Sequence, residues 1–338
     1  MGAGPVGPRA NGARASFARS GGAQRRSVYP RRMARPRGYL PLLLFLSALW
    51  GASYLFIKVA VEEIEPTAMI ELRLILAGAV LGAVLLYRVG AREAVAQVRA
   101  TGLNGLVLGV LNGAIPFTLI AWGEKHIDSG VAAIANSVVP IFVAILAIRF
   151  NPAERSTGLR FVGILLGLVG VGVLAGFHPE GGWWAVAGTM AVVVASFSYA
   201  CANLFTQRHF VATSPLVTAT AAIVWGAVVL APFAAFQIPD AMPSAEALAS
   251  VAALGILGTA IASLVLYRML VAYGSARTTL VTYLLPAFAL VYGAAFLDEE
   301  VTVNALLGLV LILGGVALGS GVFGPQRRGD AVAALPGR

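Results

Sequence analysis

Apolar stretches of similar length follow one another from residue 42 to residue 322, separated by short segments rich in charged residues, Gly and Pro. A bilayer core of about 30 Å is crossed by about 20 apolar residues in a helix. Stretches of that length recur ten times. They cover 42–61, 67–87, 103–122, 129–149, 158–177, 183–205, 215–236, 247–270, 276–297 and 301–322. The pattern predicts an all-α membrane protein with ten transmembrane helices.

Composition supports a lipid environment for most of the chain. Hydrophobic residues make up 59 % of the sequence and charged residues 12 %, and the mean hydropathy is +0.84. An ordinary soluble domain contains roughly 25 % charged residues. Because so few charges could not cover a water-exposed surface, lipid must solvate much of the protein.

The net charge of +9 does not indicate a nucleic-acid partner, because the basic residues do not gather on a soluble domain. Nine arginines lie within residues 1–38 and most others lie in short connections. With the N-terminus in the cytoplasm, the cytoplasmic segments hold Arg88, Arg92, Arg99, Arg149, Arg155, Arg160, Arg208, Arg277, Arg327 and Arg328. The outer segments then hold Glu62, Glu63, Glu65, Glu124, Asp128, Glu180, Asp240, Glu246, Asp298, Glu299 and Glu300, with Lys125. The positive-inside rule therefore predicts a multi-pass protein of the inner cell membrane with both termini cytoplasmic.

The two ends of the chain show no apolar periodicity. Residues 1–38 are rich in Gly, Ala, Arg and Pro, which predicts a disordered basic tail, and residues 323–338 are interpreted as a cytoplasmic C-terminal tail. A signal peptide is the alternative for the start, but the following apolar run is long and carries Lys58. Met33 directly precedes the basic flank MARPRGYL, so the native start is either Met1 or Met33, and residues 1–32 are expected to be dispensable.

The two halves of the sequence align with each other at an offset of 145 to 149 residues. Matched pairs include Pro66 with Pro215, Phe56 with Phe205, Trp50 with Tyr199, Gly113 with Gly258, Trp122 with Tyr267, Pro140 with Pro286, Glu154 with Glu299, Gly163 with Gly308 and Gly170 with Gly315. Each half holds five predicted helices. Because five is odd, the second copy must be inverted in the membrane. Inverted repeats are typical of secondary transporters that bind substrate near the midplane.

Several segments carry a family resemblance. They are ALWGASYLFIK (Ala48 to Lys58), Pro66 with Arg73, Pro140 within GVAAIANSVVPIFVAIL, ERSTGLRFVGILLGLVGV (Glu154 to Val171), and LDEEVTVNALLGLVLILGGVAL in the second half. They are similar to the EamA-type domain of the drug/metabolite transporter superfamily. The resemblance covers roughly residues 40–322 and implies a first repeat at 39–177 and a second at 183–322. It also implies a transporter of small organic metabolites, with export favoured over uptake. The second half has Gln207 and Ala222 where the first has Lys58 and Arg73, so these two cations act in one half.

Two matched prolines, Pro140 and Pro286, lie in the middle of the fourth and ninth predicted helices. A proline removes an amide donor and frees a carbonyl one turn earlier. Each is interpreted either as a helix break that faces a substrate cavity or as a packing kink. Asn136 and Thr282 lie four residues before them, where a polar side chain either binds substrate or satisfies the freed backbone.

Ionisable residues inside predicted membrane helices are rare and mark candidate sites. Arg73 lies deepest and is a candidate for substrate binding, and Glu71 is a candidate for a coupling proton. Since these two residues are two positions apart, they do not share a helix face. Lys58 either acts in transport or extends to the lipid headgroups.

Aromatic and small residues complete the candidates. Trp50, Tyr199 and Tyr267 are predicted to line the substrate site, whereas Trp122, near a helix end, is better explained as an interfacial anchor. Repeated glycines in the fifth and tenth helices, including Gly167 and Gly315, predict close helix packing.

No motif for catalysis or for a cofactor stands out. The pattern Gly170-x-Gly172-x-x-Ala175 imitates a dinucleotide fingerprint but lies in a membrane helix without a preceding strand. The three histidines are dispersed, and the one cysteine, Cys201, can form no internal disulfide. We expect a protein without cofactor or metal that is not an enzyme.

The protein is predicted to be a secondary transporter of a small organic metabolite, amino acid-like molecules included, that works by alternating access. The alternatives are a proton-coupled multidrug or cation exporter and a non-transporting scaffold, and a homodimer is open.

Overall fold

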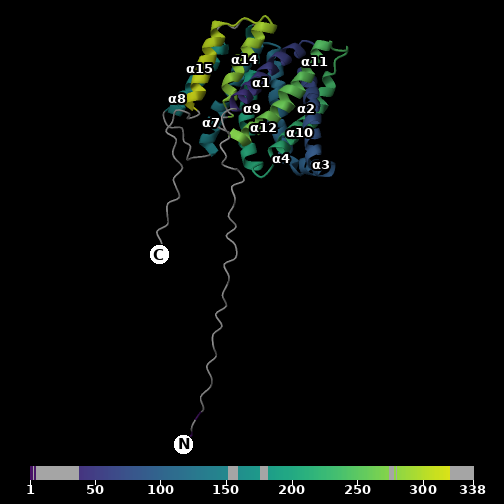
Figure 1. The fold of residues 1–338 in the computed structure, drawn as a ribbon. Coiled ribbons are helices and arrows are strands. Elements are labelled where there is room, and N and C mark those ends of the chain that lie inside the picture. Colours follow the sequence, from purple (N-terminus) through teal and green to yellow (C-terminus); the bar gives the residue numbers. More distant parts are fainter. Residues whose placement is uncertain are drawn as a thin grey trace. The chain divides into compact units, whose positions relative to one another are not determined.

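The computed structural model describes residues 1, 2, 4, 38–150, 159–175, 182–273, 278 and 280–319. The chain divides into two units, Met1–Met33 and Ala34–Arg338, and the fold reported below is that of the second. Its described residues form helices and their connections, without a strand, as Figure 1 shows. The all-helical class is therefore confirmed for this part of the chain. The predicted tails, 1–38 and 323–338, lie almost entirely outside the described residues.

Six helices are long and apolar enough to cross a membrane. Four of them are α1 (Tyr39–Val61), α2 (Pro66–Val89), α9 (Gly182–His209) and α10 (Pro215–Ala234). The other two, Gly102–Glu124 and Ala245–Tyr273, are composite and are described below. Four shorter apolar segments lie at Ser129–Val143, Phe161–Leu174, Val281–Phe296 and Val303–Leu318. All of these segments fall within stretches that the apolar pattern predicts, give or take a few residues at their ends.

Both composite helices contain a π-helical segment. In such a segment the backbone hydrogen bonds join residues five positions apart, rather than four as in an α-helix. The first consists of α4 (Gly102–Gly109), η2 (Val110–Ala114) and α5 (Ile115–Glu124), and the second of α11 (Ala245–Ala253), η5 (Leu254–Ile261) and α12 (Ala262–Tyr273). Pro116, the second residue of α5, has no amide hydrogen to continue the α-helical pattern. The matched glycines of the two halves, Gly113 and Gly258, lie in these two segments. π-Helical turns are frequent at functional sites.

The two matched prolines differ in their effect. α6 (Ser129–Asn136) ends before Ser137, and α7 (Val139–Phe150) begins two residues later with Pro140 in its first turn. By contrast, α14 (Val281–Phe296) continues through Pro286. The helix break predicted at Pro286 is therefore wrong. Pro286 is the sixth residue of α14, beyond the four whose amides have no partner within the helix, so it removes one backbone bond and α14 continues despite that loss.

Three further helices complete the described fold. α3 (Ala91–Ala100) follows α2 as a short helix with mostly exposed residues that the apolar pattern did not predict. α8 (Leu159–Ala175) and α15 (Val303–Gly319) pack against each other, and the contacts of their glycines show that they are antiparallel. A Cβ on Gly170 would lie 2.9 Å from the backbone nitrogen of Ile312, and one on Gly315 would lie 2.5 Å from the nitrogen of Gly167.

Close backbone approach also joins the two halves elsewhere. A Cβ on Gly109 in α4 would lie 2.5 Å from the backbone nitrogen of Gly226 in α10. Without a hydrophobic driving force in lipid, helices associate through such van der Waals contact between small residues. Gly167 itself faces the side chain of Ile141 in α7.

The connections after α1, α5, α10 and α14 meet at one end of the helices, which we call the acidic end. Its acidic residues are Glu62, Glu63, Glu65, Asp128, Asp240, Glu246, Asp298, Glu299 and Glu300. Lys125 forms an ion pair of 2.8 Å with Glu65, and the backbone nitrogen of Ser244 donates a hydrogen bond of 2.7 Å to Glu63. The bonds from the Ser244 hydroxyl and amide hold the pKa of the exposed Glu63 carboxyl below its usual value. The short helix α3 lies at the opposite end (Figure 1).

Candidate functional site

A set of polar and aromatic side chains lies inside the helix bundle, where each is buried or partly buried. We call it the central cluster. Its members come from six of the helical segments, α1, α2, α5, α6, α9 and η5, and are Tyr54, Arg73, Phe117, Asn136, Ser196, Tyr199 and Thr259. Segments from both halves of the chain contribute, so the cluster lies where the two halves meet.

Arg73 in α2 is the buried cation of this cluster, with a relative exposure of 6 %. Its Nε donates a hydrogen bond of 2.8 Å to Oγ1 of Thr259, and Cζ lies 3.7 Å from the centroid of the Phe117 ring. Charge placed in a low-dielectric interior is unfavourable unless it is paired, and an aromatic face partly compensates it. Within the described residues, Nε is the guanidinium nitrogen that has a hydrogen-bond partner. No hydrogen bond to either terminal nitrogen occurs among the described residues.

The π-helical segment η5 brings Thr259 to Arg73. Gly255 permits the approach, because a Cβ there would lie 2.8 Å from Cβ of Leu76 and 3.1 Å from the carbonyl oxygen of Arg73. Thr259 Oγ1 donates a bond of 2.9 Å to the carbonyl of Leu254, five residues earlier. The hydroxyl therefore uses its proton on its own helix and keeps its lone pairs for Arg73.

Asn136 is the last residue of α6 and connects three helices. Its Nδ2 donates a bond of 2.9 Å to the hydroxyl of Tyr54 in α1, and its Oδ1 accepts one of 3.0 Å from the hydroxyl of Ser196 in α9. Pro140 has no amide for the carbonyl of Asn136, so α6 ends here. The side chain of Asn136 thus orients Tyr54 and Ser196 around the helix break.

The predicted aromatic residues are divided between the cluster and its surroundings. Tyr199 in α9 lies edge-to-face on Phe117, with ring centroids 6.3 Å apart. Trp50 in α1 and Tyr267 in α12 are partly buried and pack against the same hydrophobic core. Thr282, the second residue of α14, is also partly buried.

Glu71 is the sixth of the 24 residues of α2 and is partly exposed. One of its carboxylate oxygens, Oε2, is buried and has no hydrogen-bond partner among the described residues. Arg73 is bound to Thr259 instead, as expected for residues that point to different faces of the helix.

Lys58 is bound to the protein backbone. Its ammonium group donates bonds of 2.8 Å to the carbonyl of Glu124 and 2.9 Å to the carbonyl of Ile127. The carbonyl of Glu124 belongs to the last residue of α5, where a cation is favoured by the helix dipole, and that of Ile127 lies in the connection that follows. Lys58 therefore caps α5 from α1.

Glu124 corrects a second sequence interpretation. The charge pattern put it in an outer segment between helices, but it is the last residue of α5 and is completely buried, with 0 % relative exposure. Both carboxylate oxygens have no hydrogen-bond partner in the described part of the chain. Its carboxylate is within electrostatic reach of Lys58, Arg73 and Glu299.

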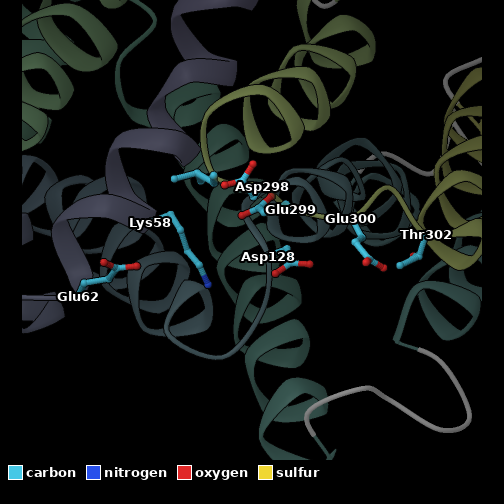
Figure 2. Close-up of a pocket in the computed structure, with 8 residues that line it drawn as sticks. Lys58, Glu62, Asp128, Asp298, Glu299, Glu300 and Thr302 are labelled. Atoms are coloured by element: carbon cyan, nitrogen blue, oxygen red, sulfur yellow. The ribbon is translucent and has the colours of Figure 1, made fainter.

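A pocket of about 310 Å³ opens near these residues at the acidic end. It is lined by Lys58, Glu62, Asp128, Leu297, Asp298, Glu299, Glu300 and Thr302 (Figure 2). Among the described residues, no group of three His, Cys, Asp or Glu side chains is placed to hold a metal ion.

The sequence interpretation missed Tyr54, Phe117, Ser196, Thr259 and Glu124. A signal for Tyr54 was present, because Trp50, Tyr54 and Lys58 follow one another at intervals of four residues and so share one face of α1. Thr259 gave no such signal. Its contact with Arg73 depends on the π-helical segment η5, which no sequence pattern predicted.

Both halves of the chain match one protein family. The matched residues are 38–176 and 186–321, and the family is described as the EamA-like transporter family.

Relatives and a solved structure extend this match. An uncharacterized inner membrane transporter of Escherichia coli strain K12, YedA, is 28 % identical over 290 residues, which cover 84 % of this chain and 92 % of the relative. A probable amino-acid metabolite efflux pump of Salmonella typhimurium is 27 % identical over 310 residues, which cover 88 % and 99 %. A crystal structure with 20 % sequence identity superposes with a TM-score of 0.59 over 84 % of this chain and 98 % of its own, which shows a common fold.

Proposed function

Because the chain belongs to the EamA-like transporter family, we propose that it is a secondary transporter that exports a small organic metabolite across the inner membrane, with amino acids as the first class to test. The family supplies the premise that the protein is a membrane transporter. The direction and the substrate class are supported by the relative named as a probable amino-acid metabolite efflux pump, and the membrane by the relative named as an inner membrane transporter.

The buried Arg73 is the observation that carries the substrate proposal. Its guanidinium is held by Thr259 and Phe117, and its two terminal nitrogens have no hydrogen-bond partner in the described residues. A guanidinium binds a carboxylate through two parallel hydrogen bonds. A small molecule with a carboxylate, such as an amino acid, would therefore bind here, where the two halves meet.

The side chains around Arg73 fit a polar organic molecule of this kind. Tyr54 and Tyr199 supply hydroxyls within electrostatic reach of Arg73. Asn136 and Thr282 would offer polar contacts where α6 ends and α14 begins, and Trp50 and Tyr267 would supply apolar walls. The helix break at Pro140 would let the backbone adjust around the substrate.

Alternating access is supported by contacts that occur in matched pairs. α1 packs on α14 and on α11, η5 and α12, while α9 packs on α6 and α7 and on α4, η2 and α5. Likewise α2 packs on η5, and α10 packs on α4 and η2. Matched helices of the two halves thus contact matched partners. This is expected if two inverted five-helix repeats, 39–177 and 183–322, are related by a two-fold axis in the membrane plane. The ten-span topology would then let the two halves rock about the central cluster.

Flux in sealed proteoliposomes tests the proposal. Vesicles preloaded with each member of a panel of radiolabelled amino acids should lose label faster with the protein than without it. The Arg73→Ala variant should reduce the rate about tenfold or more, which corresponds to about 1.4 kcal/mol. Arg88→Ala, which removes an exposed arginine from the same helix, is the matched control and should transport normally.

Two results would contradict the proposal. Equal flux for Arg73→Ala and Arg88→Ala would place the substrate elsewhere. An absence of flux for every member of the panel and for a wider set of organic acids and organic cations would favour the scaffold alternative.

A further inference from the structure

Glu124 has an environment that the proposed substrate site does not explain. It lies at the end of α5, its side chain is completely buried, and neither carboxylate oxygen accepts a hydrogen bond within the described residues. A carboxylate removed from water without donors is strongly disfavoured relative to the neutral acid. A buried group of this kind in a membrane protein is a functional candidate by default.

The charged groups around Glu124 come from three sides. Tyr54 and Lys58 face it from α1, Arg73 from α2, and Glu299 from the connection before α15. α5 also packs on α6 and α9. α6 has no titratable side chain, and Tyr199 of α9 interacts with Arg73 and Tyr54. The sum of the formal charges of Lys58, Arg73 and Glu299 is therefore positive when Glu124 is neutral.

Lys58 and Glu299 are already engaged by the protein backbone. The ammonium group of Lys58 is bound to the carbonyls of Glu124 and Ile127. The carboxylate of Glu299 accepts bonds from the amides of Ser129 and Gly130 and from the hydroxyl of Ser129. Their charges are thus satisfied without the Glu124 side chain, for which no hydrogen-bond partner occurs in the part of the chain that the structure describes.

Geometry decides which ion suits this position. The side chain has no exposed surface, so a hydrated ion has no room beside it in this arrangement. A metal cation would also need several oxygen ligands, and it would be repelled by Lys58 and Arg73. A proton needs neither space nor further ligands.

We propose that Glu124 is the proton-binding residue that couples transport to the proton gradient, an inference that rests on the proposed transport function. In the closed arrangement the carboxyl is protonated. When the bundle opens and water enters, the O–H bond breaks and the proton passes to water, which leaves a carboxylate. This carboxylate then binds the ammonium group of an amino acid whose own carboxylate is bound by Arg73.

Exchange follows from this competition. One carboxylate holds either a proton or the ammonium group of the substrate, so the two cross the membrane in opposite directions. An inward proton gradient would therefore drive export. Glu71, which the sequence favoured for this role, is partly exposed on α2 and is the rival residue.

Infrared difference spectroscopy tests proton binding without any substrate. The purified protein in lipid is titrated with acid, and the carbonyl stretch of protonated carboxyl groups is recorded. The band should contain a component that is lost in Glu124→Gln and retained in Glu71→Gln and in Glu246→Gln. Glu246 is an exposed carboxylate at the same end and serves as the matched control. If no component is lost in Glu124→Gln, the proposal is overturned.

Accumulation in proteoliposomes tests coupling. With the membrane potential clamped at zero and the interior one pH unit more acidic, exchange of one proton per substrate should give about tenfold accumulation of the labelled amino acid. In Glu124→Gln the ratio should fall to about one. Accumulation that persists in Glu124→Gln, or that requires an alkaline interior, contradicts the exchange.

The two experiments separate the possible failures. If the infrared component belongs to Glu124 but no labelled amino acid moves in the unaltered protein, the proposed substrate is wrong and the proton site stands. If amino acids move and Glu71→Gln, rather than Glu124→Gln, removes both the component and the accumulation, the coupling residue is Glu71 and this inference is refuted.

Discussion

The carboxylate of Glu299 caps the N-terminus of α6 through Ser129. One oxygen accepts a bond of 2.7 Å from the Ser129 amide, and the other accepts one of 2.8 Å from the Ser129 hydroxyl. The two residues are 170 positions apart and belong to different halves of the chain. A negative charge is favoured at this end of a helix, because the first amides have no partner within the helix. The second half thereby holds in place the helix that ends at Asn136.

Removing this cap should destabilise the protein. Glu299→Gln would keep the shape of the side chain but lose its charge, and we expect a loss of about 1 to 2 kcal/mol, as for other helix N-caps. Thermal unfolding in detergent measures it. Glu300→Gln, the exposed neighbour, is the control and should leave the melting temperature unchanged. Equal melting temperatures for both variants would show that the cap does not stabilise α6.

Because α8 and α15 pack closely, substitution of Gly315 and substitution of its neighbour Gly314 should affect stability differently. A Cβ on Gly315 would lie 2.5 Å from the nitrogen of Gly167 and 2.6 Å from the carbonyl oxygen of Gly163, both backbone atoms that cannot move aside. A Cβ on Gly314 would meet a side-chain atom of Leu166 at an ordinary 3.6 Å. We expect Gly315→Ala to lower stability by about 1 to 3 kcal/mol, as overpacking does, and Gly314→Ala to have no such effect. A lower melting temperature for Gly314→Ala than for Gly315→Ala would contradict this packing of α8 on α15.

Asn136→Ala and Thr282→Ala are expected to impair transport more than folding. Asn136 loses two hydrogen bonds, and such bonds in membrane proteins average about 0.6 kcal/mol, so stability should fall by about 1 kcal/mol. Disturbing Tyr54 next to the proposed substrate site should lower flux about tenfold, which corresponds to about 1.4 kcal/mol. Flux and melting temperature are measured on the same samples, with Asn203→Ala on the exposed side of α9 as control. Flux losses that merely follow the stability losses would make both residues structural.

Topology is a separate prediction. The alternation of basic and acidic connections predicts that both termini are cytoplasmic and that the connection near Asp240 lies outside. Reporter fusions at the C-terminus and in that connection should therefore report opposite sides of the membrane. The same side for both would rule out the ten-span arrangement.

The sequence by itself determined the class of the protein and most of its helices. Apolar length is a local property, so 42–61 anticipated α1 and 67–87 anticipated α2 within a few residues. Arg73 could also be chosen from the sequence, because a charge within an apolar stretch stands out whatever surrounds it. The effect of the prolines was less predictable, because a break at Pro140 and a continuous helix at Pro286 depend on where each helix begins.

Tertiary structure decided which polar residues are buried and what they contact. Arg73 meets Thr259 across 186 positions, Lys58 meets the end of α5 across 66, and Glu299 meets Ser129 across 170. Glu124 next to Lys125 reads as a surface pair, yet Lys125 turns to Glu65 while Glu124 is enclosed. Whether a side chain at a helix end is buried depends on the neighbouring helices, and the local sequence does not show which helices those are. The ionisable groups of this protein therefore acquire their environments only when the helices pack together, within the first half for Lys58 and across both halves for Arg73 and Glu299.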